Sequence, residues 1–136
     1  MQRKLGQLTG TCFQRCVGMD AFNALHSVTY EIDEKYKTDY HKKFISFLTK
    51  MHESNLVIGG AMTDVKGDRS KPPHQQADQD LYLRVVKRDK KGVYVSGAKA
   101  HQTGCLNSHW MVIMPTLRLT EDDKDYAIVG ALPIES

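Results

Sequence analysis

Long apolar runs are missing from this sequence, and no segment of it is long enough to span a membrane. The first residues, Met1 to Gly6, lack the apolar core of a secretory signal. Cysteine is scarce and odd in number, with three residues in the chain, which argues against a disulfide framework and fits a reducing compartment. We therefore expect a cytoplasmic protein with no membrane attachment.

Strong charge of either sign is also missing. The formal net charge is +3, and the charged residues are spread along the chain. One local cluster, Lys87–Lys91, stands beside a glycine and contains no aromatic side chain, so it indicates a solvated hairpin tip and not a nucleic-acid surface. With 136 residues, 40% hydrophobic and 26% charged, the chain has the size and composition of one modest globular domain.

Several catalytic signatures are absent as well. The sequence has no Gly-x-Ser-x-Gly elbow, no His-Glu-x-x-His zinc helix, no Gly-x-Gly-x-x-Gly fingerprint and no Gly-x-x-x-x-Gly-Lys-Ser/Thr phosphate loop. Internal repeats and low-complexity segments are missing too. The chemistry of the chain must therefore lie in other patterns.

Before residue 57, apolar residues recur at the spacing of amphipathic helices. One helical face consists of Phe22, Leu25, Thr29, Ile32 and Tyr36, and a second consists of Tyr40, Phe44, Phe47, Leu48 and Met51. Between them, Thr38 is the expected N-cap of the second helix. We predict a helical hairpin whose apolar stripes are core packing.

After residue 57 the pattern becomes that of strands. Consecutive prolines at 72 and 73 place a loop within residues 63–80. Strands are expected at 56–58, 81–86, 93–96, 109–114 and 126–132. Gly92 is expected to supply a positive φ in a hairpin with a bulge. The fold class predicted is α+β, a helical hairpin followed by an antiparallel β domain.

Two thiols stand four residues apart at the start of the helical half. On a helix, Cys12 and Cys16 would share one face about one turn apart, with Gln14 and Arg15 beside them. Thiolates so placed can hold an iron–sulfur cluster or another soft metal, and the two side chains between them can meet a polar or anionic ligand. The spacing alone leaves open the alternative that both cysteines are small buried hydrophobes.

A first polar stretch, Thr63–Ser70, follows the helical half. Backbone amides around Gly67, together with Arg69 and Ser70, can cradle a phosphate or the polar edge of a flavin. The alternative is a polar turn between helix and sheet.

A second polar stretch, Gly97–Gly104, directly follows an expected strand. Its small residues let a planar ligand approach the backbone closely, and Gln102 and Thr103 carry groups that can donate to a ring nitrogen. His101 can donate or accept, although a lone loop histidine more often has a structural role.

Three segments together resemble one group of enzymes: Cys12–Ala21, Met62–Ser70 and Gly97–Gly104. They are similar to the 4-hydroxybutyryl-CoA dehydratases, a branch of the wider 4-hydroxyphenylacetate 3-hydroxylase flavoprotein family. The resemblance spans nearly the whole chain and implies a fragment of an acyl-CoA dehydrogenase-like fold. Residues 1–56 would end the N-terminal helical domain, residues 57–136 would form an incomplete middle β domain, and the C-terminal helical domain would be absent.

The resemblance also implies site residues. Cys12 and Cys16 match two ligands of a [4Fe–4S] cluster whose other two ligands belong to a C-terminal region, and Cys105 matches no ligand position. Gln14 and Arg15 match positions facing the substrate cavity, and Thr103 matches a threonine that hydrogen-bonds the flavin near N5, so these three are the expected catalytic residues. The residues expected to bind FAD, in addition to Thr103, are Gly60, Ala61, Met62, Thr63, Lys66, Gly67, Asp68 and Arg69.

The implied reaction is that of a lyase and isomerase. A CoA-thioester substrate, 4-hydroxybutyryl-CoA, would be dehydrated to crotonyl-CoA, and vinylacetyl-CoA would be isomerised. FAD would accept an electron transiently, and the cluster iron would act as a Lewis acid toward the departing hydroxyl. The family implies a homotetramer, and a chain with half of the cluster ligands is expected to be inactive without its C-terminal part.

Two alternatives to this function stay open. The first is an FAD-dependent oxidoreductase like 4-hydroxyphenylacetate 3-monooxygenase, which has no use for paired thiols. The second is a truncated product that only folds or associates and has no catalytic role.

Overall fold

The computed structural model describes residues 2–10 and 15–134. The chain divides into two compact units. The first consists of residues 1–60, 104–111 and 133–136, and the second of residues 61–103 and 112–132. The helices belong to the first unit, and the two-stranded hairpin belongs to the second.

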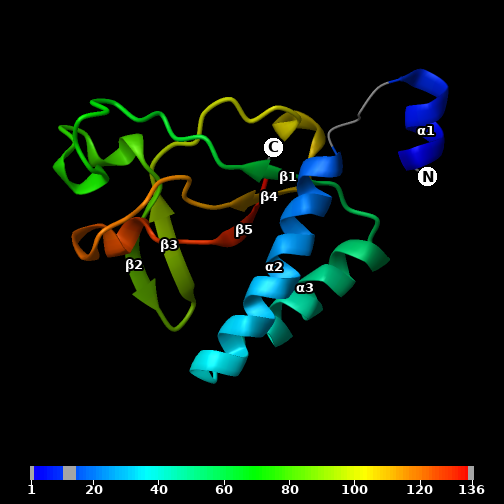
Figure 1. Ribbon diagram of the computed structural model, residues 1–136, viewed down its shortest axis with the longest axis horizontal. Helices are drawn as coiled ribbons and strands as arrows, with labels where there is room; N and C mark the ends of the chain where they lie inside the picture. The colour runs from blue at the N-terminus through cyan, green and yellow to red at the C-terminus, as the bar shows by residue number, and fades with distance from the viewer. Residues whose placement is uncertain (1, 11–14, 135–136) are drawn as a thin grey trace. The chain divides into compact units, whose positions relative to one another are not determined.

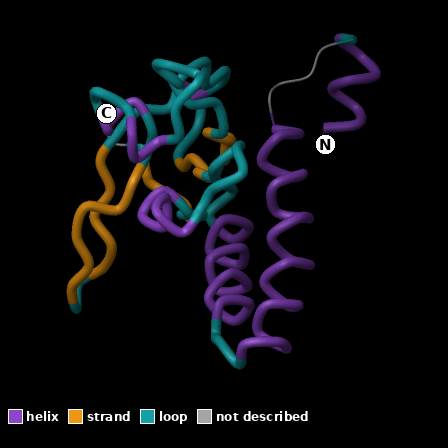
Figure 2. The backbone as a smooth tube through the Cα atoms, turned by 60° about the vertical axis from the view of Figure 1, so that its left-hand side comes forward, coloured by secondary structure: helices purple, strands orange, loops and turns teal. Residues whose placement is uncertain are grey.

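The predicted helical hairpin is confirmed. The helices are α1 (Gln2–Thr9), α2 (Arg15–Tyr36) and α3 (Tyr40–Glu53), and α2 and α3 lie side by side (Figures 1 and 2). The ring of Phe22 packs edge-on against Phe44 and Phe47, with centroid separations of 5.8 and 6.1 Å. Among the described residues, none of the helices is both long enough and apolar enough to cross a membrane.

The start of α3 is capped by a residue other than the expected one. Asp39 occupies the N-cap position, and its side chain makes no capping bond. The carboxylate of Asp33, on the last turns of α2, instead accepts from Tyr40 N and His41 N, both at 2.9 Å, and from Thr38 Oγ1 at 2.5 Å. The prediction for Thr38 was therefore wrong, because its hydroxyl donates to the capping group and does not replace it.

Three strands form one sheet in the order β1-β4-β5: β1 (Ile58–Ala61), β4 (Trp110–Ile113) and β5 (Gly130–Pro133). Main-chain bonds from His109 N to Val57 O and from Met114 N to Ala61 O advance in the same direction along both segments, so β1 and β4 run parallel. Ile134 N donates to His109 O, which joins the end of β5 to the start of β4. The predicted α+β class is confirmed, but the sheet is mixed at β1, where an antiparallel β domain was expected.

β1 continues through Gly59 and Gly60, beyond the strand expected at residues 56–58. A Cβ on Gly18 of α2 would strike the carbonyl oxygen of Ile58, and a Cβ on Gly60 would lie 2.7 Å from Val17 Cγ1. α2 thus approaches β1 at backbone distance, and this contact requires glycine on both elements.

The second unit contains the predicted hairpin, β2 (Arg84–Asp89) paired antiparallel with β3 (Gly92–Ser96) (Figure 1). Asp89 faces Gly92 across the turn, and Gly92 has the expected positive φ, +152°. The bulge lies between Val85 and Lys87, away from the turn.

In the described part of the chain, four 3-10 turns interrupt the loops: η1 (Pro73–Gln75), η2 (Gln79–Leu81), η3 (Cys105–Asn107) and η4 (Glu121–Tyr126). Two expected strands are shorter for this reason. Leu81 belongs to η2, where Asp78 accepts from Asp80 N at 2.9 Å. Tyr126 ends η4, and its ring packs on Tyr82 with a centroid distance of 6.4 Å.

Candidate functional site

Much of the cysteine motif lies outside the described residues. Cys12 and Gln14 fall within residues 11–14, which the structure does not describe. Arg15 and Cys16 are the first two residues of α2, and their side chains are not described either. Their roles stay predictions. Within residues 2–10 and 15–134, no group of three or more His, Cys, Asp or Glu side chains is placed to hold a metal ion. Cys105 is half-buried and makes no disulfide.

The first polar stretch is held in shape by one buried amide, that of Gln76, which is 6% exposed. Its Oε1 accepts from Asp68 N at 3.0 Å, and its Nε2 donates to Asp68 O and Lys71 O at 2.8 and 2.9 Å. Bonds from the hydroxyl and the amide of Ser70 lower the pKa of the Asp68 carboxyl. The loop is therefore ordered by its own hydrogen bonds.

The backbone of this loop turns at Lys66 and Gly67, with φ values of +79° and +48°. A Cβ on Gly67 would lie 2.5 Å from Leu81 Cδ1 and 2.6 Å from Gln76 Oε1. The hydroxyl of Tyr82 donates to Lys66 O at 2.9 Å, and burial raises the pKa of that phenol. Gly67 is thus required both for its conformation and for its close packing.

The second polar stretch runs directly beside the first. Ala100 N donates to Thr63 O at 2.8 Å, and Asp64 and Lys99 form an isolated antiparallel bridge. Gln102 Nε2 donates to Ala100 O and, at 3.4 Å, to Thr63 O. One amide bond of Gln102 therefore ties the second loop to the first, and the other closes the second loop on itself, so the amide hydrogens are not free to bind a ring nitrogen as expected.

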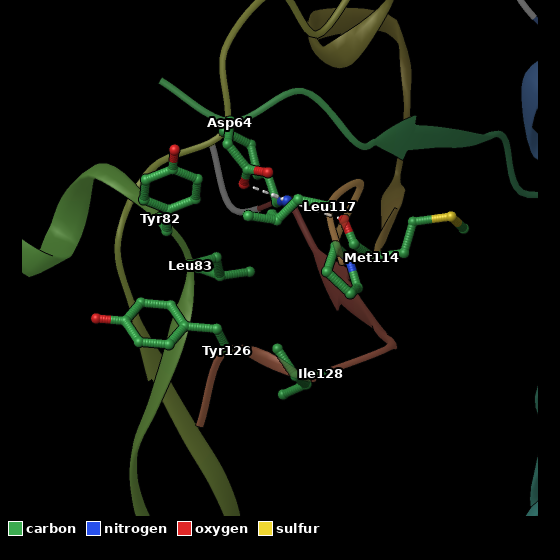
Figure 3. Close-up of a pocket in the computed structure, with 9 residues that line it drawn as sticks. Asp64, Tyr82, Leu83, Met114, Leu117, Tyr126 and Ile128 are labelled. Carbon is green, nitrogen blue, oxygen red and sulfur yellow. Dashed lines mark hydrogen bonds and ion pairs between the residues drawn. The ribbon is translucent and has the colours of Figure 1, made fainter. Parts of the chain in front are cut away.

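An ion pair lies at this junction. Lys99 Nζ is 2.5 Å from Asp64 Oδ1, and the two side chains are only 9% and 2% exposed. The pair borders a cavity of about 10 Å³, which has room for a single water-sized group and no more. Figure 3 shows its lining residues: Asp64, Tyr82, Leu83, Lys99, Met114, Pro115, Leu117, Tyr126 and Ile128. This cavity is therefore too small to hold a flavin.

Two of the predicted site residues present unused donors at the surface of the loops. Arg69 and Thr103 are exposed, and the Arg69 guanidinium and Thr103 hydroxyl make no hydrogen bond to another described residue. Thr103 N donates to His101 O at 3.0 Å, so the loop geometry of this residue is fixed through its backbone. The remaining predicted positions differ in exposure: Gly60 and Ala61 lie in β1, Met62 is exposed, and Thr63 and Lys66 are half-buried.

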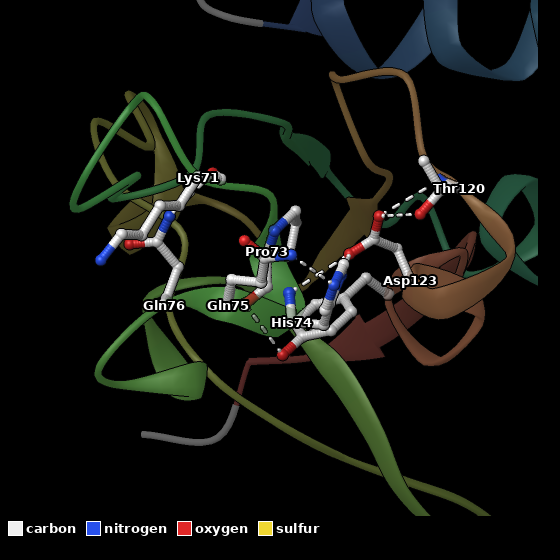
Figure 4. Close-up of polar contacts among 8 residues, drawn as sticks. Lys71, Pro73, His74, Gln75, Gln76, Thr120 and Asp123 are labelled. Carbon is white, nitrogen blue, oxygen red and sulfur yellow. Dashed lines mark hydrogen bonds and ion pairs between the residues drawn. The ribbon is translucent and has the colours of Figure 1, made fainter.

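A buried carboxylate that the sequence did not reveal lies elsewhere in the second unit. Asp123, 1% exposed, accepts from His74 N and Nδ1 at 3.2 and 2.8 Å, and from Thr120 N and Oγ1 at 3.1 and 2.7 Å (Figure 4). Burial of the carboxyl opposes ionisation, but these hydrogen bonds outweigh it and lower the pKa of Asp123 to about 2. This network fastens η1 to η4 and contains none of the predicted ligand-binding residues.

The donor set of the two loops fits a flavin. Arg69 can neutralise an anionic group, and Thr103 offers a hydroxyl on a loop of small residues that a ring can approach. Both side chains are free of other described hydrogen-bond partners, and the backbone beneath them is fixed by Gln76 and by the bond from Ala100 N to Thr63 O.

Comparisons with known proteins agree on one family. Residues 1–136 match the family described as 4-hydroxyphenylacetate 3-hydroxylase N terminal. The chain is 58% identical, over all 136 residues, to 4-hydroxybutyryl-CoA dehydratase/vinylacetyl-CoA-Δ-isomerase of Clostridium aminobutyricum, and covers 28% of that protein. It is 27% identical over 114 residues, which are 84% of the chain and 23% of the relative, to the oxygenase component of 4-hydroxyphenylacetate 3-monooxygenase from Thermus thermophilus.

Solved structures give the same result. An oxygen-tolerant archaeal 4-hydroxybutyryl-CoA dehydratase from N. maritimus is 72% identical, with a TM-score of 0.89 over 97% of the chain and 26% of that structure. The FAD complex of an oxygenase component of 4-hydroxyphenylacetate 3-monooxygenase shares the fold at 24% identity, with a TM-score of 0.65 over 82% of the chain and 23% of that structure. The chain thus spans about a quarter of the length of these relatives. It belongs to the 4-hydroxyphenylacetate 3-hydroxylase family and matches the N-terminal region of that family.

Proposed function

We propose that the chain is the N-terminal part of a flavin- and [4Fe–4S]-dependent 4-hydroxybutyryl-CoA dehydratase that also isomerises vinylacetyl-CoA. The observation that carries the flavin site is the pairing of the two polar loops, which leaves Arg69 and Thr103 as unused donors. The choice of reaction rests on the 58% identity to the dehydratase over the whole chain.

The residues of this chain would bind and orient the reacting groups. Arg69 would pair with an anionic part of FAD, Thr103 would donate to the flavin ring, and Gln14 and Arg15 would face the CoA-thioester substrate. Cys12 and Cys16 would each supply a thiolate to the cluster. When bound, FAD would supply reversible electron transfer and the cluster iron a Lewis acid toward the substrate hydroxyl.

We extend the proposal to the whole enzyme. Residues 1–56 would end a helical domain and residues 57–136 would form part of a middle β domain in an acyl-CoA dehydrogenase-like fold. The remaining cluster ligands and a helical domain would come from a C-terminal part, and the whole protein would assemble as a cytoplasmic homotetramer.

A second candidate function is that of an FAD-dependent 4-hydroxyphenylacetate 3-monooxygenase. The observation in its favour is the 27% identity to such an oxygenase component. The paired thiols Cys12 and Cys16 favour the dehydratase, since a hydroxylase of this kind needs no cluster.

The two functions are separated by one assay on a full-length protein built on this chain. Anaerobically purified protein should convert 4-hydroxybutyryl-CoA to crotonyl-CoA and should not hydroxylate 4-hydroxyphenylacetate when a reduced flavin is supplied. Hydroxylation without dehydration would support the monooxygenase and overturn the proposal. A full-length protein that folds but does neither would favour the non-catalytic alternative.

A further inference from the structure

A buried ion pair between Lys99 and Asp64 stands where the two loops meet. We propose that Lys99 and Asp64 are positioning residues that fix the separation of Thr63 and Thr103, and through it the affinity for FAD. The flavin part of this inference rests on the proposed function.

The ammonium of Lys99 has no donor left for a ligand. An ammonium carries three N–H groups. Lys99 Nζ donates to Asp64 Oδ1 at 2.5 Å, to Met114 O at 2.8 Å and to Met62 O at 3.1 Å. All three hydrogens are thus used inside the protein, and the side chain is 9% exposed. This excludes direct flavin or substrate binding by Lys99 and leaves a role in holding its neighbours.

Asp64 is equally committed. Its Oδ1 accepts from Lys99, its Oδ2 accepts from Thr116 Oγ1 at 3.4 Å, and its side chain is 2% exposed. The pair therefore joins three segments of the second unit: the first loop at Met62 and Asp64, the second loop at Lys99, and the segment after β4 at Met114 and Thr116. Figure 3 shows Asp64 and Met114 on either side of the ammonium group.

In sequence, Asp64 and Lys99 lie close to Thr63 and Thr103, two of the residues expected to bind FAD. Asp64 follows Thr63, whose carbonyl oxygen accepts from Ala100 N, and Lys99 precedes Ala100. Loss of the ammonium would leave a buried carboxylate and two carbonyls without their donor, and the loops would then move to reach other donors. Thr103, four residues beyond Lys99, would move with the second loop.

A variant that lacks both charges distinguishes an effect on loop position from an effect on folding stability. Replacing both members of a buried ion pair by apolar residues of similar volume often leaves the folding stability unchanged or raises it. Removing only one member lowers the stability, because the other charge is left buried without a partner. The double variant Lys99→Met with Asp64→Leu should therefore recover much of the stability lost in Lys99→Met. It cannot restore the bonds to Met62 O and Met114 O, so FAD affinity should stay low.

The test uses the full-length protein and two measurements. The dissociation constant of FAD is measured by fluorescence, well below the melting temperature of each variant, and the exchange rate of the Ala100 amide is measured in the protein without flavin. Asp123→Asn is the matched control, because it breaks another buried polar network of the same unit. Lys99→Met and the double variant should weaken FAD binding about tenfold or more and speed Ala100 exchange, while Asp123→Asn changes both by less than about threefold.

Wild-type affinity in Lys99→Met, or a loss of flavin that follows the melting temperature equally in Lys99→Met and Asp123→Asn, would overturn the inference. A folded wild-type protein that binds no FAD would instead overturn the proposed function and the flavin part of the inference. In that case the Ala100 exchange rates would still decide whether the pair fixes the loop junction.

Discussion

Arg69 is an exposed cation whose guanidinium makes no hydrogen bond to another described residue, on a loop that Gln76 holds in place. A charge-assisted contact with FAD should be worth about 1.5–3 kcal/mol. Arg69→Ala in the full-length protein should therefore lower flavin retention without lowering the melting temperature. Arg88→Ala, which removes an exposed arginine from the hairpin, is the control. Equal flavin retention in wild type and Arg69→Ala would contradict the assignment.

Thr103 offers a test of flavin chemistry that does not depend on affinity. A hydroxyl near the flavin ring stabilises one redox state over another, while valine keeps the shape of the side chain. Thr103→Val should shift the reduction potential of bound FAD and leave thermal stability nearly unchanged, because the side chain is exposed. An unchanged potential with unchanged activity would show that Thr103 has only a structural role.

Asp123 sets a pH dependence of stability. Its pKa in the folded chain is about 2, compared with 3.8 for an ordinary aspartate. A lowered pKa stabilises the folded state when the group is ionised, so the contribution is present above pH 3.8 and is lost as the pH falls toward 2. The difference corresponds to roughly 2 kcal/mol.

Urea unfolding of wild type and Asp123→Asn at pH 7 and at pH 2.5 measures this contribution. The gap in unfolding free energy between the two proteins should narrow in acid. A gap that is the same at both pH values would show that ionised Asp123 does not stabilise the fold.

These residues differ in how readily the sequence reveals them. Arg69 and Thr103 stand in polar stretches rich in small residues, which is a local pattern. Asp64, Lys99, Gln76 and Asp123 are also polar, but their roles depend on partners 15 to 52 residues away or on burial, as for Lys99 with Met114 and Asp64 with Thr116. A single sequence carries no signal of such partners, so their roles became visible only in the structure.

At the scale of elements, the end of α2 determines the start of α3. The carboxylate of Asp33 accepts from Tyr40 N and His41 N, whereas Asp39 at the N-cap position makes no side-chain bond to the helix. Asp33→Ala should therefore lower the melting temperature more than Asp39→Ala does. Burial raises the pKa of the Asp33 carboxyl, but the bonds from Thr38, His41 and Tyr40 outweigh it and lower that pKa, so the capping weakens when acid protonates the group. Equal effects of both substitutions on thermal unfolding would contradict the capping role of Asp33.

Periodicity predicted α2, α3, the β2–β3 hairpin and β4, since each has a repeating apolar pattern or a clear turn signal. Periodicity gave the wrong structure where contacts between distant parts of the chain determine the conformation. Tyr126 reads as a strand residue, yet its ring packs on Tyr82 and its hydroxyl donates to Pro73 O at 3.4 Å, which keeps it in η4. The parallel pairing of β1 with β4 joins segments far apart in the chain, and no local pattern encodes it.

At the scale of the whole molecule, the chain covers 28% of the dehydratase relative. Cys12 and Cys16 would supply two cluster ligands, and metal affinity requires several deprotonated ligands held together. The isolated chain should therefore fail to hold a stable [4Fe–4S] cluster and should show no dehydratase activity. Anaerobic reconstitution with iron and sulfide followed by iron counting tests this. A stoichiometric cluster on the isolated chain would contradict it and would point to Cys105 or a histidine as a further ligand.

Counting iron and flavin together on the anaerobically reconstituted full-length protein tests the dehydratase assignment most directly. A dehydratase of this kind should hold about four iron atoms for each FAD, whereas a monooxygenase should hold FAD alone. Cys12→Ala and Cys16→Ala should each lose the iron, and Cys105→Ala should keep it. Four iron atoms per flavin that depend on both Cys12 and Cys16 is the predicted result. Full-length protein that binds FAD but no iron, or whose iron is unaffected by Cys12→Ala and Cys16→Ala, would contradict the assignment.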